Sequence, residues 1–112
     1  MDTTTPLQHQ RCITCTNGMP ALDESEAQRL LAALNNWQRE GKAIVKTYQF
    51  KDHYETLAFV NALAWISHRT DHHPDLAVGY NQFRVSYWTH AANGLSINDF
   101  ICAAKVDALL AI

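Results

Sequence analysis

The sequence has few of the features that mark secreted, membrane or nucleic-acid-binding proteins. Three cysteines in 112 residues are an odd number, which does not suit a disulfide scaffold and favours a reducing compartment. No apolar run approaches the ~20 residues that span a bilayer, and the N-terminus lacks a signal-peptide pattern. The formal net charge of -2 gives no general attraction to nucleic acid or anionic membranes. We therefore expect a cytoplasmic protein with no nucleic-acid or membrane partner.

The amino-acid composition of the chain is that of one globular domain. Apolar residues make up 47% of the chain and charged residues 18%, and this length buries a modest core without disulfides. The N-terminal stretch differs, since it is rich in Thr, Gln and Asn and is interrupted by Pro6, Gly18 and Pro20. We predict a flexible arm over residues 1–20 and a single domain over residues 21–112.

The arm contains one motif of interest, His9-x2-Cys12-x2-Cys15. Two nearby thiols can form half of a zinc site or a redox pair. A structural zinc site needs four ligands, and only Cys102 remains as a further thiol. A metal or redox role is therefore the less favoured interpretation of this motif.

Two hairpins, separated and flanked by helices, are predicted for the rest of the chain. Asp23 and Asp52 are each followed three residues later by a glutamate, and Ser96 by Asp99, which is the capping-box pattern of a helix start. The predicted helices run from Asp23 to Asn35-Asn36, over His53–Thr70, and onward from Ser96. The predicted strands are residues 37–40, 43–50, 76–79 and 83–89. This order, α-β-β-α-β-β-α, predicts a two-layer α+β fold with one antiparallel sheet of about four strands covered by helices.

The helix over His53–Thr70 is apolar on more than one face. Leu57 and Val60 lie on one face, and Phe59 and Leu63 on another. A helix of this kind is expected to pack against a sheet on one side and a partner subunit on the other. We expect a homodimer or a homotetramer.

The most informative stretch runs from Ser67 to Pro74 and holds three imidazoles, those of His68, His72 and His73. Pro74 disfavours helical backbone at His73, so the helix should end by Asp71 or His72. Side chains on such a turn can converge on a concave site. A further imidazole, His90, follows one hairpin later.

A metal site is the competing interpretation of these histidines. His68-x3-His72 on a helix is a known zinc-binding spacing, and His90 would add a third ligand. Pro74 argues against this set, because unwinding before His72 removes the helical geometry that the pair needs. We expect no metal.

The spacing His-x3-His-His-Pro-x5-Tyr-x9-His-x8-Asp resembles the signature of the pterin-4a-carbinolamine dehydratases. In this chain it consists of His68, His72, His73, Pro74, Tyr80, His90 and Asp99. The similarity runs from about Leu22 to Leu110 and includes Trp37, Gly41, Phe50-Lys51-Asp52 and Gly94-Leu95-Ser96. It implies a hydro-lyase that dehydrates 4a-hydroxytetrahydropterin, the product left by aromatic amino acid hydroxylases, to quinonoid dihydropterin and water.

The resemblance also implies roles for individual residues. His72 and His90 match general acid/base histidines, and His73 matches a catalytic-site histidine that mainly positions the substrate. The substrate-binding set comprises His68, Asp71, His73, Trp88, Thr89 and Asp99. Many members have a glutamate where this chain has His68, which changes the local charge. No cofactor is implied, because the pterin is the substrate.

Histidine suits this chemistry. Loss of hydroxide from C4a requires a proton on the departing oxygen, and the neighbouring ring nitrogen must give one up. An imidazole with an ordinary pKa of ~6.5 does either at neutral pH. General acid–base assistance of ~10²–10⁴-fold is enough for a reaction that proceeds slowly unaided. The alternative is a non-catalytic relative that binds pterin or protein, since one family member also serves as a dimerisation cofactor of a homeodomain transcription factor.

Overall fold

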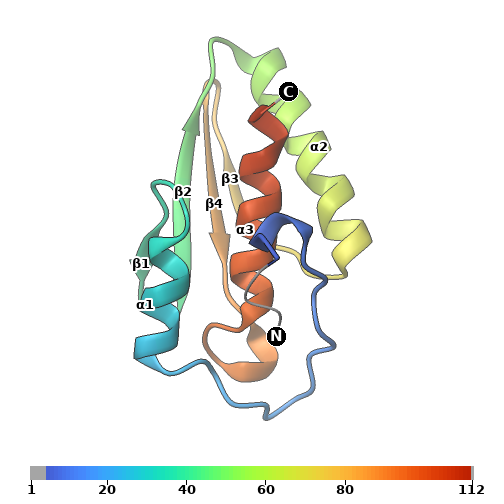
Figure 1. Ribbon diagram of the computed structural model, residues 1–112. Coiled ribbons are helices and arrows are strands. Elements are labelled where there is room, and N and C mark those ends of the chain that lie inside the picture. The colour runs from blue at the N-terminus through green and yellow to red at the C-terminus, as the bar shows by residue number, and fades with distance from the viewer. Residues whose placement is uncertain (1–4, 112) are drawn as a thin grey trace.

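A four-stranded antiparallel sheet forms one layer of the fold in the computed structural model, which describes residues 5–111. Its strands are β1 (Gln38–Glu40), β2 (Ala43–Gln49), β3 (Asp75–Val78) and β4 (Gln82–Tyr87), and they lie in the order β1-β2-β4-β3. The helices are α1 (Glu24–Ala32), α2 (His53–Thr70) and α3 (Ile97–Ala108), with short 3-10 helices η1 (Leu7–His9), η2 (His90–Ala92) and η3 (Leu109–Ala111) (Figure 1). The predicted α+β fold and its order of elements are confirmed.

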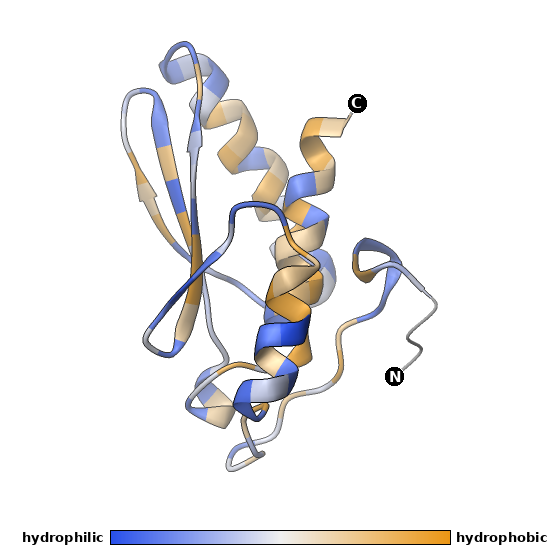
Figure 2. Cartoon of the chain, turned by 60° about the vertical axis from the view of Figure 1, so that its left-hand side comes forward, coloured by the Kyte–Doolittle hydropathy of each residue, from blue (hydrophilic) through white to orange (hydrophobic). Residues whose placement is uncertain are grey.

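The two hairpins join through their second strands. β2 pairs with β4 from Ile44 opposite Tyr87 to Gln49 opposite Gln82, so β1 and β3 form the two edges of the sheet. Hydrophobic and hydrophilic residues alternate along β4, where buried positions alternate with exposed or half-buried ones (Figure 2), which turns one face of the sheet toward a core. The fully buried members of that face are Ile44, Phe83, Val85 and Tyr87. Side chains of all three long helices complete the same core.

The helix starts follow the predicted caps. The Asp23 carboxylate accepts a hydrogen bond from the Glu26 N–H at 2.8 Å, and the Asp52 carboxylate accepts one from the Glu55 N–H at 2.9 Å. α2 ends at Thr70, as the position of Pro74 predicted. α1 ends at Ala32, earlier than the predicted Asn35-Asn36.

β4 is shorter than predicted at its C-terminal end. The sequence predicted a strand to Thr89, but the strand ends at Tyr87. Thr89 instead pairs with Gly94: its N–H donates to the Gly94 carbonyl at 2.8 Å and its carbonyl accepts from the Gly94 N–H at 3.3 Å. This small loop encloses η2, so His90 begins a 3-10 helix and does not continue the strand.

The N-terminal arm runs alongside α3 before it reaches α1 (Figure 1). The Asn98 amide in the first turn of α3 donates to the Ile13 carbonyl and accepts from the Ile13 N–H, both at 2.8 Å. Lys105 donates to the Gln8 carbonyl at 2.8 Å, and the Gly18 N–H donates to the Ala91 carbonyl at 3.0 Å. Residues 1–4 of the predicted arm lie outside the described residues, and the arm's flexibility stays a prediction.

Between residues 5 and 111, no helix combines the length and the apolar character needed to cross a membrane.

Candidate active site

One pocket collects most of the residues that the sequence singled out. It has a volume of about 450 Å³ and is lined by residues 12–15 of the arm, 70–73 after α2, 88–91 after β4, and Asn98 of α3. We call it the histidine pocket. The predicted site residues on its lining are Asp71, His72, His73, Trp88, Thr89 and His90. His68 and Asp99 are not on the lining.

The end of α2 sets the positions of His72 and His73. The Thr70 hydroxyl donates to the Ile66 carbonyl at 2.8 Å, which holds the last turn. Asp71 then adopts a left-handed conformation with φ of 51°, one that Asp tolerates better than most residues. The chain turns out of the helix there, and β3 begins directly after Pro74. His72 and His73 therefore lie on the turn between α2 and the sheet.

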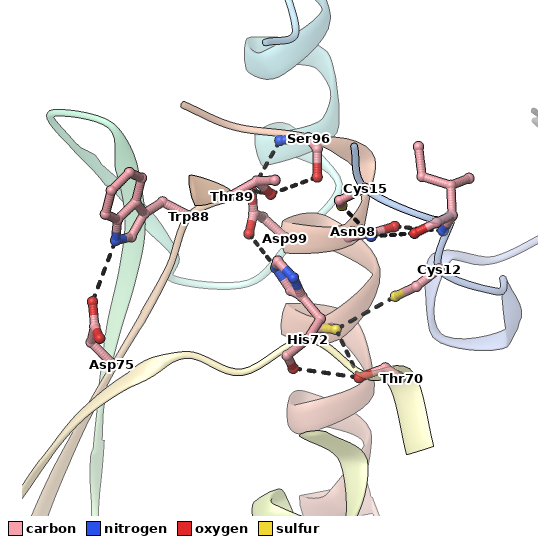
Figure 3. Close-up of polar contacts among 12 residues, drawn as sticks. Cys12, Cys15, Thr70, His72, Asp75, Trp88, Thr89, Ser96, Asn98 and Asp99 are labelled. Carbon is pink, nitrogen blue, oxygen red and sulfur yellow. Dashed lines mark hydrogen bonds and ion pairs between the residues drawn. The ribbon is translucent and has the colours of Figure 1, made fainter. Parts of the chain in front are cut away.

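His72 is the most constrained imidazole of the pocket. Its side chain is 11% exposed, and its ring stacks on Tyr87 with centroids 5.8 Å apart and planes 9° apart. The ring Nε2 lies 2.7 Å from Asp99 Oδ1 (Figure 3). Because a carboxylate only accepts, Nε2 carries the hydrogen in this contact. Nδ1 is then the nitrogen that can exchange a proton with a bound molecule.

Asp99 is a fully buried carboxylate behind His72. Its Oδ2 accepts from the Thr89 hydroxyl at 2.8 Å and from the Ser96 N–H at 2.9 Å. Ser96 Oγ lies 2.7 Å from Thr89 Oγ1. Because the Thr89 hydroxyl donates its one hydrogen to Asp99, Ser96 is the donor in this contact and Thr89 the acceptor. The N-terminal turn of α3 also favours a negative charge. Asp99 does not line the pocket itself, but it holds two lining residues, His72 and Thr89, by hydrogen bonds.

His90 and Trp88 form another part of the pocket lining. Their ring centroids are 3.8 Å apart with planes at 30°. The Trp88 indole N–H donates to Asp75 Oδ2 at 3.3 Å (Figure 3), which ties this ring to the start of β3. His73 and His90 are both exposed, so a molecule from solvent can reach them.

His68 stands apart from the other imidazoles. It remains on α2, with its ring centroid 5.5 Å from that of Trp65, and α2 ends between it and His72. The alternative metal set of His68, His72 and His90 is therefore not assembled. Among residues 5–111 no group of three or more His, Cys, Asp or Glu side chains is placed to hold a metal ion.

Sequence reasoning missed the part of the pocket that the arm supplies. Cys12 and Cys15 line it, although nothing in their spacing connects them to the histidines. Asn98 was also missed. Its only signal in the sequence is that it is a polar residue next to Asp99 in the first turn of an apolar helix. In the structure it is buried there.

Comparisons with known proteins give the family of the chain. The sequence profile of the family described as Pterin 4 alpha carbinolamine dehydratase matches residues 20–109. A protein of Nitrosospira multiformis, named as a candidate pterin-4-alpha-carbinolamine dehydratase, is 54% identical over 113 residues that cover 100% of both chains. One of the same name from Dechloromonas aromatica is 52% identical over 112 residues, again 100% of both. The chain belongs to the pterin 4 alpha carbinolamine dehydratase family.

Solved structures share the fold. One is a transcriptional coactivator/pterin dehydratase from Brucella melitensis, with a TM-score of 0.77 and 34% identity over 80% of this chain and 97% of that one. Another is a pterin dehydratase-like protein identified as a RuBisCO assembly factor in the alpha-carboxysome, with a TM-score of 0.59 and 28% identity over 67% and 89%. The fold is therefore shared by proteins described with roles besides dehydration.

Proposed function

We propose that this protein dehydrates 4a-hydroxytetrahydropterin to quinonoid dihydropterin and water, by general acid–base catalysis in the histidine pocket. The observation that carries the proposal is the convergence of His72, His73 and His90 on one pocket, with His72 held by a buried carboxylate. The reaction would recycle the pterin cofactor of an aromatic amino acid hydroxylase in the cytoplasm.

The proposed chemistry moves two protons. One imidazole, from His72 or His90, gives a proton to the C4a hydroxyl, which leaves as water. The other takes the proton from the adjacent ring nitrogen as the quinonoid double bond forms. Asp99 keeps the hydrogen on Nε2 of His72 and leaves Nδ1 to make the transfer. His73 holds the substrate, with Asp71, Trp88 and Thr89 around it.

The direct test is the decay of synthetic 4a-hydroxytetrahydropterin, followed by absorbance with and without the protein. We expect clear acceleration of the decay, saturable in substrate. Failure to accelerate it, with retained binding of a stable pterin measured by calorimetry, would favour a non-catalytic pterin-binding relative. Failure of both would leave a protein-binding role, the second candidate, which is supported by the RuBisCO assembly factor that shares the fold.

A homodimer or homotetramer is the second part of the proposal. α2 exposes Tyr54, at 83%, and Trp65, at 62%, on the side away from its buried residues Phe59 and Leu63. β3 is an edge strand that exposes Leu76 and Val78. Exposed apolar side chains and an unpaired strand edge are both features that subunit contacts cover.

Trp65→Asp should weaken the assembly. A charge placed on a buried apolar contact costs several kcal/mol, so light scattering at micromolar concentration should give a smaller mass than for the wild-type chain. Ala32→Asp, which adds the same charge to an exposed position of α1, is the control and should keep the wild-type mass. A wild-type monomer at this concentration would remove the basis of the proposal.

A further inference from the structure

Two thiols from opposite ends of the sequence meet beside the histidine pocket. Cys12 Sγ of the arm lies 3.6 Å from Cys102 Sγ of α3 (Figure 3). Cys102 is fully buried. Cys12 is half-buried and lines both the histidine pocket and a second pocket on the α2 side of the arm. One thiol is therefore open to a reagent from solvent, and the other lies directly behind it.

The surroundings give the two thiols different reactivity. The hydrogen bond with Cys102 lowers the pKa of Cys12, and the nearby positive charge of Lys105 acts in the same direction. The same contact, together with burial, raises the pKa of Cys102. Because the thiolate is the nucleophile in disulfide exchange, Cys12 is placed to react first and Cys102 second.

We propose that Cys12 and Cys102 form a reversible disulfide when the protein meets a low-molecular-weight disulfide such as oxidised glutathione. The Cys12 thiolate attacks one sulfur of the reagent, and the first glutathione thiolate leaves. Cys102 then loses its proton to solvent and attacks the Cys12 sulfur, and the second glutathione leaves. Two electrons pass from the protein thiols to the reagent, and their two protons end on the released glutathione thiols.

The arm is already held where this bond would form. The paired hydrogen bonds between Asn98 and Ile13 fix the residue next to Cys12, so only the two sulfurs need to approach. Cys15 is held differently, because its sulfur accepts from the Asn98 amide at 3.3 Å. Cys102, not Cys15, is therefore the partner of Cys12. The bond would tie the arm to α3 and fix one wall of the histidine pocket.

The test is exposure of the full chain to oxidised glutathione, followed by alkylation of the remaining thiols in denaturant and mass spectrometry. We expect the intact mass before alkylation to fall by two hydrogens. Alkylation should then modify only Cys15. Trypsin cuts after Arg11 and Lys105, so residues 12–29 should appear linked to residues 85–105. The oxidised protein should unfold at a temperature higher by ~5 °C or more, because the bond closes a long loop. Dithiothreitol should reverse both changes.

Matched variants separate this bond from its competitors. Cys15→Ser should still form the link, and Cys12→Ser should not. No substitution of the buried Cys102 is needed, because the linked peptide is detected in the wild-type chain. A bond confined to residues 12–29, a stable glutathione adduct on Cys12, or an unchanged mass would each overturn the proposal. None of these readouts uses pterin turnover, so they stand apart from the proposed function.

Discussion

Replacing both His72 and His90 with alanine should bring the dehydration rate close to that of the unaided reaction. General acid–base catalysis contributes ~10²–10⁴-fold, and the double variant removes both groups to which we assign proton transfer. Each single variant, His72→Ala or His90→Ala, should lower kcat by less than the double variant, because the remaining imidazole covers part of the loss. His73→Ala should chiefly raise KM, since this side chain is proposed to hold the substrate.

The stereochemistry of the substrate sharpens this experiment. The two imidazoles come from different walls of the pocket, one following α2 and the other beginning η2. We propose that they deliver a proton to hydroxyl groups of different C4a configurations. Each single variant should lose one stereoisomer more than the other, which is measured by following the two isomers separately in the absorbance assay.

His53→Ala is the matched control for these variants. His53 is the first residue of α2, its ring stacks on Tyr80 with centroids 6.0 Å apart, and it does not line the histidine pocket. It should keep the wild-type kcat and KM. A double variant of His72 and His90 that stays folded and retains the wild-type rate would contradict the assignment of proton transfer to these residues.

Local signals in the sequence predicted the elements that depend on local contacts. The carboxylates of Asp23 and Asp52 cap α1 and α2 through N–H groups three residues away, and Pro74 acts on the backbone immediately before it. The capping residues and the proline are visible in any short window of the chain. The four-strand antiparallel sheet followed from two pairs of short strand segments, each pair joined by a short turn.

The same reasoning could not predict contacts between segments that are far apart in the sequence. The end of β4 depends on the pairing of Thr89 with Gly94, which outweighed the strand tendency of Trp88 and Thr89. The arm has a composition typical of a disordered segment, yet its course is set by contacts with residues far along the chain, among them Asn98 and Lys105. Cys12 and Cys102 are 90 positions apart. No spacing rule connects such residues before the fold is known.

Asp99 shows how a local explanation can conceal a second role. The pattern Ser96-x2-Asp99 is a capping box, and capping is enough to account for the aspartate. Its other oxygen, however, accepts from His72, 27 positions earlier in the sequence. One carboxylate therefore fixes both the start of α3 and the imidazole in the pocket.

Asp99→Ala should cost the protein both stability and catalysis. Removing one partner of a buried charged network costs ~3–5 kcal/mol, and here the loss leaves hydrogen-bond donors on His72, Thr89 and the Ser96 backbone with no acceptor. Urea denaturation should show the midpoint falling while the slope stays the same. Since the domain could unfold altogether with this change, a milder substitution is needed to examine catalysis.

Asp99→Asn keeps the size of the side chain and separates orientation from folding. An amide offers one acceptor oxygen, and its NH2 group must then face a donor, either His72 Nε2–H or the Thr89 and Ser96 donors on the other side. We expect a loss of ~1–3 kcal/mol in the free energy of unfolding and a lower kcat, because His72 loses the partner that fixes its tautomer. Nitrogen-15 NMR of the imidazoles should show hydrogen on Nε2 of His72 in the wild-type chain and a mixture of tautomers in the variant. Asp23→Asn, at the exposed cap of α1, makes the same chemical change where Asn caps as well as Asp and should alter neither rate nor tautomer. A folded Asp99→Asn protein with the wild-type kcat and an unchanged His72 tautomer would show that the carboxylate serves only to cap α3.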